Sequence, residues 1–142
     1  ALHERDVLVD GLVADAEGRD HLPDDAAQLK TQLLRLADAR QVNLILTTGG
    51  TGFSPRDITP EATCAVADRN APGIAEAMRY HSLSITPRGM LSRGVSVLRG
   101  KTLIVNLPGS PKAVQENLEY ILPSLEHGVR IAAGLDGECA RK

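Results

Sequence analysis

Residues 43–63 read Asn43-Leu-Ile-Leu-Thr-Thr-Gly-Gly-Thr-Gly-Phe-Ser-Pro-Arg-Asp-Ile-Thr-Pro-Glu-Ala-Thr63, and this segment carries the clearest structural signals in the chain. Its first six residues predict a short buried strand over 43–48, which a run of glycines ends. Thr59 then has the features of a helix N-cap, with Pro60 at the first helical position, and predicts a helix to about Arg69. The order of strand, glycine-rich turn and helix is typical of layered α/β folds.

The segments on either side extend this alternation of strands and helices. Asp25 and Gln28 have the spacing of a capping box, which predicts a helix over about 25–40. Within residues 1–22, the run at 6–14 is apolar enough for a strand or a short helix, and the i, i+4 spacing of its apolar residues favours the end of a helix. A further helix is predicted over 73–81, after a Pro-Gly pair that interrupts the chain.

Two strands and a long helical region are predicted in the last third of the chain. Residues 95–98 alternate like a strand, and residues 101–106 form a second apolar run after an Arg-Gly turn. Ser110 is a good N-cap for the helix that follows it. Pro123 is predicted to begin a separate helical segment that ends near Gly134.

Composition excludes several classes of protein. The chain has 142 residues and a net charge of −2, which predicts one globular domain without an overall basic surface for nucleic acid. It contains one Phe, two Tyr and no Trp, so aromatic platforms for stacking bases are not expected either. No apolar run approaches the roughly 18 residues of a membrane span. Cys64 and Cys139 lie far apart, which favours two reduced thiols in a cytoplasmic protein over a metal or redox site.

The loops that follow the strands at 43–48 and 101–106 are the candidate site, because ligands of layered α/β folds bind beyond the carboxyl ends of strands. In the first loop, Gly49, Gly50, Thr51 and Gly52 allow backbone N–H groups to approach an anion, although a tight turn without a ligand would use the same residues. The dinucleotide fingerprint fails there, because Pro55 stands where its third glycine belongs.

The second candidate loop, Asn106-Leu-Pro-Gly-Ser110, places a helix N-terminus directly after a strand. Free N–H groups and the helix dipole favour a phosphate at such a position, and the alternative is an ordinary connection capped by Ser110. Gly100-Lys101-Thr102 is not the end of a P-loop, because Val95 occupies the position of the first glycine and the segment is a turn between strands.

Two carboxylates and one basic pair are further candidates. Asp57 follows the glycines directly, and Asp24 is not needed as a helix cap because Asp25 already fills that role. Asp24 is also explained as a solvated loop acid or an alternative helix cap, and Asp57 as part of a surface Arg-Asp pair or as a turn residue. Ser92 and Arg93 could bind a phosphate or an acidic ligand, or could be solvent-exposed. The four histidines show no ligand spacing, and no arrangement of residues indicates nucleophilic catalysis.

The segment at 44–63 resembles the molybdopterin adenylyltransferase family, which includes bacterial MogA, the gephyrin G domain and the plant molybdenum-cofactor adenylyltransferases. Three further blocks carry the same resemblance: Leu22-Pro-Asp-Asp25, Met90-Leu-Ser-Arg93 and Arg99-Gly-Lys-Thr-Leu-Ile-Val-Asn-Leu-Pro-Gly-Ser110. The resemblance spans about residues 22–134. It implies a three-layer α/β sandwich with a mostly parallel central sheet and, usually, a homotrimer.

The resemblance also implies an activity. Enzymes of this family transfer the adenylyl group of ATP to molybdopterin in the presence of Mg²⁺ and release pyrophosphate, and a molybdate-inserting enzyme or domain receives the product. Asp57 matches the family's essential aspartate, and Asp24 matches the acid of its Pro-Asp block, so both are expected to be catalytic and to hold Mg²⁺. The expected nucleotide- and pterin-binding positions are Gly49, Gly50, Thr51, Gly52, Ser82, Ser92, Asn106, Pro108, Gly109 and Ser110.

The N-terminal part departs from the family pattern. The family opens with a strand that ends in Ser-Asp, and residues 1–20 do not match it. We therefore expect a single molybdopterin-binding domain over 1–142 in which residues 1–20 are divergent or lack the opening strand. A chain that lost this strand would lose part of the pocket and would be less stable, with an exposed sheet edge. The alternative function is a molybdopterin-binding or trimeric scaffold module without turnover.

Overall fold

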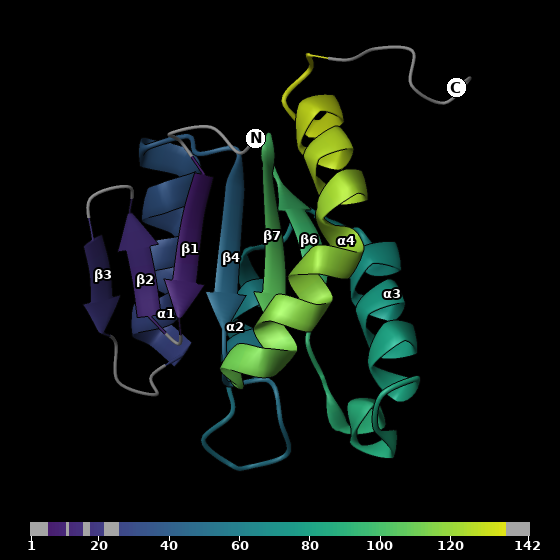
Figure 1. Cartoon of the computed structure of the whole chain (residues 1–142). Coiled ribbons are helices and arrows are strands. Elements are labelled where there is room, and N and C mark those ends of the chain that lie inside the picture. The colour runs from purple at the N-terminus through teal and green to yellow at the C-terminus, as the bar shows by residue number, and fades with distance from the viewer. Residues whose placement is uncertain (1–5, 11, 16–17, 22–25, 136–142) are drawn as a thin grey trace.

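The computed structural model describes the backbone of residues 6–10, 12–15 and 18–21 and the whole of residues 26–135 (Figure 1). Strands and helices alternate along this part of the chain. The elements are β1 (Asp6–Asp10), β2 (Leu12–Asp15), β3 (Gly18–His21), α1 (Ala26–Leu34), the π-helical turn η1 (Arg35–Ala39), β4 (Leu44–Thr48), α2 (Thr59–Val66), β5 (Arg69–Asn70), α3 (Pro72–Leu83), the 3₁₀ turn η2 (Pro87–Leu91), β6 (Ser96–Arg99), β7 (Thr102–Leu107) and α4 (Pro111–Ala132).

The main sheet has the strand order β1-β4-β7-β6-β5. Strand β4 pairs in parallel with β1 on one side and with β7 on the other. Strand β6 runs antiparallel to β7, and β5 runs antiparallel to β6, so β5 again has the direction of β7. The carboxyl ends of β4 and β7 therefore meet at the same edge of the sheet, and both candidate loops leave from that edge. Strands β2 and β3 form a separate antiparallel hairpin beside β1 (Figure 1).

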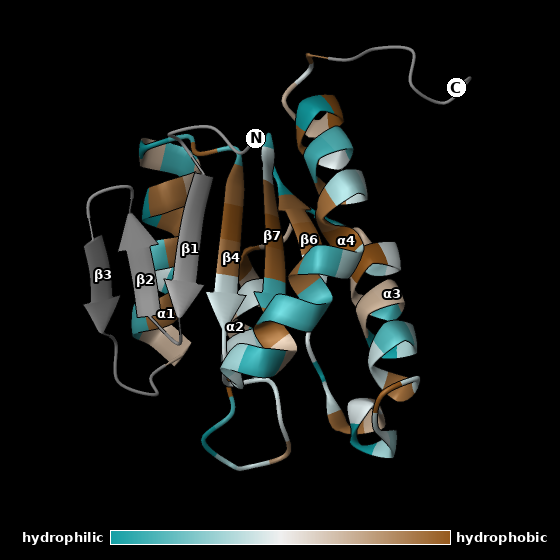
Figure 2. Cartoon of the chain, viewed as in Figure 1, coloured by the Kyte–Doolittle hydropathy of each residue, from teal (hydrophilic) through white to brown (hydrophobic). Residues whose placement is uncertain are grey.

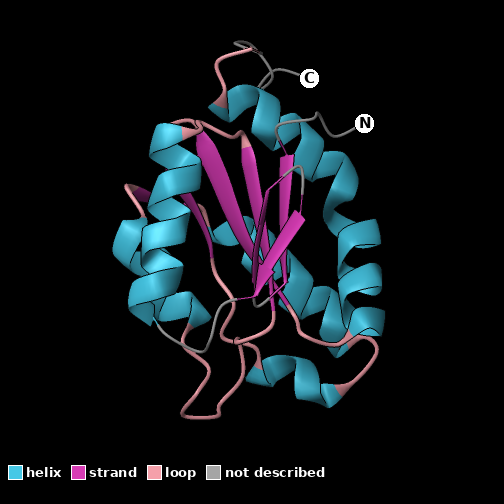
Figure 3. Ribbon diagram, turned by 90° about the vertical axis from the view of Figure 1, so that its left-hand side faces the viewer, coloured by secondary structure: helices cyan, strands magenta, loops and turns pink. Residues whose placement is uncertain are grey.

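The helices cover both faces of the sheet. Because alternate strand residues point to opposite faces, Ile45 and Ile104 pack with the buried leucines of α1 and with α2. Their neighbours Leu44, Leu103 and Val105 pack on the other face with α3 and α4. Figure 3 shows the strands between the two helical layers. The expected three-layer α/β sandwich, with four of the five strands of the main sheet running in one direction, is confirmed.

Aliphatic residues build both cores. The side chains of Leu33, Leu36, Ile45, Ile104 and Leu125 are fully buried. Burial of each such side chain stabilises the fold by about 1.5–3 kcal/mol relative to its exposure. Figure 2 shows the apolar residues concentrated on β4, β7 and the inner sides of the helices. Among the described helices, none is both long and apolar enough to cross a membrane.

The interpretation of residues 1–22 as the end of a helix is wrong. Residues 6–10 form β1, and their residue partners on β4 run from Leu44 to Thr48. A short apolar run has no decisive period, and a continuous run is also typical of a strand in a parallel sheet. β4 supplies the backbone partners that no local signal shows. An opening strand is therefore present at 6–10.

Three element boundaries also differ from the predictions. Helix α2 begins at Thr59 itself, with Ile58 as N-cap, and ends at Val66. The residues after α2 pair with β6 and form the two-residue strand β5. Helix α4 continues through Pro123. This proline lies on the exposed side of the helix, where water can hydrogen-bond the carbonyl group that its missing N–H leaves unpaired.

The remaining predicted elements are confirmed. The helix at 25–40 is present as α1 and η1, and the helix at 73–81 is present as α3. The strands at 43–48, 95–98 and 101–106 are β4, β6 and β7, each within one residue of the predicted limits. The capping box at Asp25 lies outside the described residues.

Candidate functional site

The two candidate loops are in contact. The N–H of Gly49 donates a hydrogen bond of 3.1 Å to the carbonyl oxygen of Leu107. A Cβ atom added to Gly109 would lie 3.3 Å from the Cα atom of Gly49. A side chain at position 109 would crowd the backbone of Gly49, so glycine suits this close approach. The parallel pairing of β4 with β7 thus brings Gly49–Gly52 and Pro108–Ser110 to one place.

The glycine loop has a backbone that other residues rarely adopt. Gly49 and Gly50 have φ angles of 82° and 70°, in the left-handed region that favours glycine. A Cβ atom on Gly50 would collide with the Oγ1 atom of Thr59, whose N–H donates a hydrogen bond of 3.2 Å to the carbonyl oxygen of Gly50. The N–H groups of Gly50, Thr51 and Gly52 donate to no described residue. They are available to an anion.

Helix α4 presents its N-terminus to the same place. Ser110 is the N-cap, as predicted: its hydroxyl accepts a hydrogen bond of 3.4 Å from the N–H of Ala113. The N–H groups of Gly109 and Ser110 have no acceptor among the described residues. Unpaired N–H groups and the positive end of the helix dipole both favour a negatively charged group here.

Asp57 lies beside the glycine loop. Its Oδ2 atom accepts a hydrogen bond of 3.0 Å from the N–H of Ser54, which closes a tight turn. A Cβ atom on Gly52 would lie 2.8 Å from this oxygen. The second oxygen, Oδ1, has no partner among the described residues. Asp24, the other predicted carboxylate, lies outside the described residues.

Arg93 forms hydrogen bonds with the loop that carries Asp57. Its Nε and Nη2 atoms donate hydrogen bonds of 2.7 Å to the carbonyl oxygens of Gly52 and Asp57. Its Nη1 atom forms an ion pair of 2.7 Å with Glu61. The hydrogen bond from Arg93 holds the pKa of the Glu61 carboxyl below its usual value. The N–H groups of the guanidinium already donate to protein acceptors, which argues against the hypothesis that Arg93 binds an anionic ligand.

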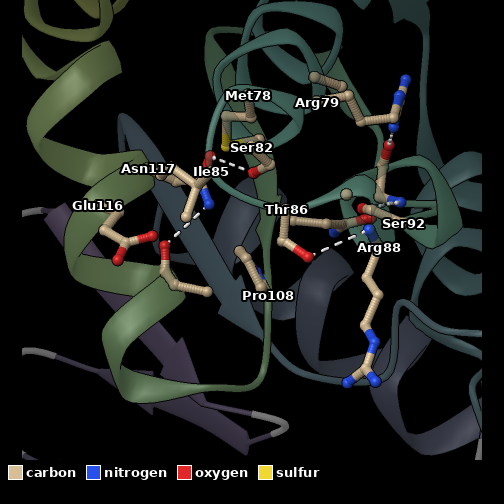
Figure 4. A pocket seen from close by; sticks show the side chains of 15 residues that line it. Met78, Arg79, Ser82, Ile85, Thr86, Arg88, Ser92, Pro108, Glu116 and Asn117 are labelled. Atoms are coloured by element: carbon tan, nitrogen blue, oxygen red, sulfur yellow. Dashed lines mark hydrogen bonds between the residues drawn. The ribbon is translucent and has the colours of Figure 1, made fainter.

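A pocket of about 190 Å³ adjoins the second loop at Asn106 and Pro108, between α3, η2 and the start of α4 (Figure 4), and no residue of Gly49–Gly52 lines it. Four of the predicted binding residues line it: Ser82, Ser92, Asn106 and Pro108. The other lining residues are Ala75, Met78, Arg79, Ile85, Thr86, Arg88, Gly89, Gly94, Ala113, Glu116 and Asn117. The site of this chain therefore consists of a backbone cradle for an anion next to a largely apolar pocket with a few polar groups.

The polar side chains of the pocket differ in how many of their hydrogen-bonding groups already have protein partners. The Ser82 hydroxyl donates to Asn117 at 3.3 Å, and the Ser92 hydroxyl accepts from the N–H of Gly94 at 3.3 Å. The Asn106 amide is fully used: it donates to two threonine hydroxyls and accepts from the N–H of Val95. Asn106 is buried and joins β7 to its neighbours, so its side chain shapes the pocket.

Apart from Ser82, the pocket residues on α3, η2 and α4 were not predicted from the sequence. Arg88 is exposed, and its guanidinium has no ion pair or hydrogen bond with a described residue. Thr86 accepts a hydrogen bond of 3.3 Å from the N–H of Arg88 and caps η2. A threonine before a proline is a readable cap signal, so this turn was open to prediction. The remaining residues carry no local signal that would place them in a pocket.

Asp57 is the described carboxylate that lies beside the glycine loop with an oxygen atom, Oδ1, that has no described partner. No group of three or more acidic, histidine or cysteine side chains among the described residues could hold a metal. Mg²⁺ is commonly bound through one or two carboxylates together with substrate phosphates and water. Asp57, with its free Oδ1 atom next to an anion cradle, fits that kind of site.

The fold and site define a layered α/β domain with unpaired backbone N–H groups on two touching loops and a small pocket nearby. Residues 7–127 match the family model described as "Probable molybdopterin binding domain", and the chain belongs to this family. The family resemblance seen in the sequence is confirmed.

Relatives and solved structures agree with this assignment. The chain is 51% identical over 100 residues to a protein named molybdopterin adenylyltransferase from Escherichia coli (strain K12). The matched residues make up 70% of this chain and 51% of that protein. It is 45% identical over 108 residues to gephyrin from Dictyostelium discoideum, which covers 76% of this chain and 15% of gephyrin. The chain thus spans about half the length of the Escherichia coli relative.

Among solved structures, the molybdopterin biosynthesis enzyme MoaB from Thermus thermophilus superimposes with a TM-score of 0.74 at 52% identity. This match covers 79% of this chain and 70% of that structure. The Mog protein from Mycobacterium ulcerans gives 0.71 at 45% identity, with 77% and 71% covered.

Proposed function

We propose that this domain adenylylates molybdopterin with ATP and releases pyrophosphate, as the names of its Escherichia coli and Haemophilus influenzae relatives describe for those proteins. The observation that carries the proposal is the meeting of two sets of unpaired backbone N–H groups, at Gly50–Gly52 and at Gly109–Ser110, beside Asp57. This arrangement suits a polyphosphate better than a neutral ligand.

The reaction needs no covalent intermediate. An oxygen of the molybdopterin phosphate attacks the α-phosphorus of ATP and forms a new P–O bond. The bond from that phosphorus to the oxygen that bridges to the β-phosphate breaks, and pyrophosphate leaves. Negative charge shifts toward the leaving group, so fixed N–H donors at the glycine loop and at the start of α4 would stabilise the transition state.

Asp57 would hold a Mg²⁺ ion through its free Oδ1 atom, with Asp24 as the second carboxylate that the family resemblance supplies. When bound, the ion would neutralise charge on the phosphates of ATP. The chain's own contribution is to fix the position of Asp57. Its Oδ2 atom is held by the N–H of Ser54, and its carbonyl oxygen is held by Arg93.

The adjoining pocket is proposed to take the pterin. Met78, Ile85 and Pro108 give it apolar surface, and Ser82 and Ser92 add hydroxyl groups (Figure 4). Ligand pockets generally combine an apolar lining with a few polar groups that fix orientation. A ligand in this pocket with its phosphate directed toward Pro108 would reach the glycine loop, because the two loops are in contact.

The family resemblance extends the proposal to the whole protein. We expect a cytoplasmic homotrimer that passes adenylylated molybdopterin to a molybdate-inserting enzyme or domain. Binding without turnover is the second candidate function.

Pyrophosphate release separates the two functions. The chain is incubated with molybdopterin and ATP, with and without Mg²⁺, while pyrophosphate and the adenylylated product are measured together. We expect Mg²⁺-dependent formation of both in equal amounts. Binding of molybdopterin without release of pyrophosphate would support the second candidate and contradict the proposed reaction.

A further inference from the structure

We propose that Arg93 and Glu61 form a clamp that positions Asp57 for catalysis, so that Arg93 is a positioning residue of the site. The role of Asp57 that the clamp serves rests on the proposed function. The existence of the clamp rests on geometry alone.

Arg93 contacts three separate parts of the chain. Its guanidinium donates to the carbonyl oxygens of Gly52 and Asp57, each at 2.7 Å, and forms a two-point pair with the Glu61 carboxylate at 2.7 and 3.2 Å. Its own N–H donates a further hydrogen bond of 2.8 Å to the carbonyl oxygen of Thr51. One residue thus joins the glycine loop, the Asp57 turn and the start of α2.

The tip of the loop lies at the protein surface, and its printed hydrogen bonds are local ones within the Ser54–Asp57 turn. Residues 53–56 are all exposed, and the Phe53 side chain is 68% exposed. Ordering such a segment costs backbone entropy, and no buried side chain at residues 53–56 offsets that cost. Arg93 hydrogen-bonds the carbonyl oxygens at both ends of the exposed segment, Gly52 and Asp57. Without these two hydrogen bonds, the whole Ser54–Asp57 turn, with its internal bond to the Asp57 carboxylate, could move relative to the glycine loop.

A second arginine provides a matched control. Arg99 pairs with Asp38 through two hydrogen bonds of 2.7 and 2.9 Å and donates to the carbonyl oxygen of Val66 at 2.9 Å. Its side chain is 26% exposed, compared with 33% for Arg93. Arg99 lies at the end of β6, on the opposite edge of the sheet from the glycine loop. It therefore makes the same type of pair without touching the site.

The test compares Arg93→Met with Arg99→Met in this chain. Amide hydrogen exchange is measured at Ser54 and Asp57, whose N–H groups donate hydrogen bonds within the turn, and kcat and KM are measured for pyrophosphate release. We expect Arg93→Met to speed exchange at these two residues by about tenfold. We expect it to lower kcat by about 10- to 100-fold, with a smaller change in the KM for ATP, since small misplacements of catalytic groups have effects of this size. Arg99→Met should change neither quantity.

Arg93→Lys should recover only part of the effect, because an ammonium group cannot reproduce the planar, multi-point contacts of a guanidinium. Equal exchange at Ser54 and Asp57 in the two methionine variants would overturn the clamp. Faster exchange with unchanged kcat would overturn its role in catalysis. If the wild-type chain releases no pyrophosphate, the proposed function fails, and the exchange comparison still decides whether the clamp exists.

Discussion

Gly50 shows how one residue connects the strand to the site. Its positive φ angle and the lack of space beside Thr59 both exclude a side chain. We expect Gly50→Ala to lower the free energy of unfolding by about 1–3 kcal/mol, measured by chemical denaturation. Gly73→Ala, in α3 with nothing near the added atom, is the control and should be neutral or stabilising by up to about 1 kcal/mol. Equal effects of the two substitutions would contradict the requirement for glycine at position 50.

Glu61 makes stability depend on pH. Its pKa is held below the ordinary value of 4.5, chiefly by the hydrogen bond from Arg93. A carboxyl with a lowered pKa in the folded state adds stability above the unfolded pKa, and this stability is lost as the pH falls through the folded pKa. We expect Glu61→Gln to reduce the loss of stability between neutral pH and pH values below 4.5. Because the pair is exposed to water, the effect will be small. An unchanged pH profile of denaturation would contradict it.

At the scale of elements, Ser110 is the junction between β7 and α4. It caps the 22 residues of α4, and its hydroxyl accepts a hydrogen bond from Ala113. Ser110→Ala should cost about 0.5–2 kcal/mol of stability as a lost cap, measured by thermal or chemical denaturation. Ser110→Asp keeps a capping oxygen and should retain the stability of the wild type. It should weaken ATP binding, since it adds negative charge where phosphate is expected. Full stability of Ser110→Ala would contradict the role of the cap.

Elements with strong local signals could be predicted from the sequence, and the others depend on distant partners. The cap at Ser110 and the glycines after β4 could be predicted from the sequence, because a serine before a helix and glycines after a strand each have one main structural explanation. Strand β1 was missed because its short apolar run becomes a strand only through pairing with β4. Strand β5 has two residues, too few for any period, and pairing with β6 defines it.

The site divides in the same way. Its two loops were predictable because the carboxyl ends of parallel strands collect ligands in layered α/β folds. The role of Arg93 was not, because two of its acceptors are main-chain carbonyls at positions 36 and 41 residues away. Main-chain acceptors leave no signature in residue type. The pocket residues on α3 and α4 are likewise joined only by the packing of those helices.

At the scale of the whole molecule, the expected trimer can be tested directly. Large apolar side chains are exposed on α3 and α4, among them Tyr80 at 75% and Tyr120 at 46%. Contacts between copies of the chain would remove such side chains from water. Sedimentation equilibrium at micromolar concentrations should give a mass of three times the 15.1 kDa of one chain. A mass of one chain across that range would contradict the trimer.

The central claim is that Asp57 and the backbone cradle beside it carry out adenylyl transfer. The most direct measurement is pyrophosphate release by Asp57→Asn, made alongside direct binding of molybdopterin to the same variant. This substitution keeps the size and shape of the side chain and removes its charge. We expect molybdopterin binding and stability close to those of the wild type, with turnover lower by about 10²- to 10³-fold. Turnover close to that of the wild type would contradict the account, and loss of molybdopterin binding would assign Asp57 to substrate recognition instead.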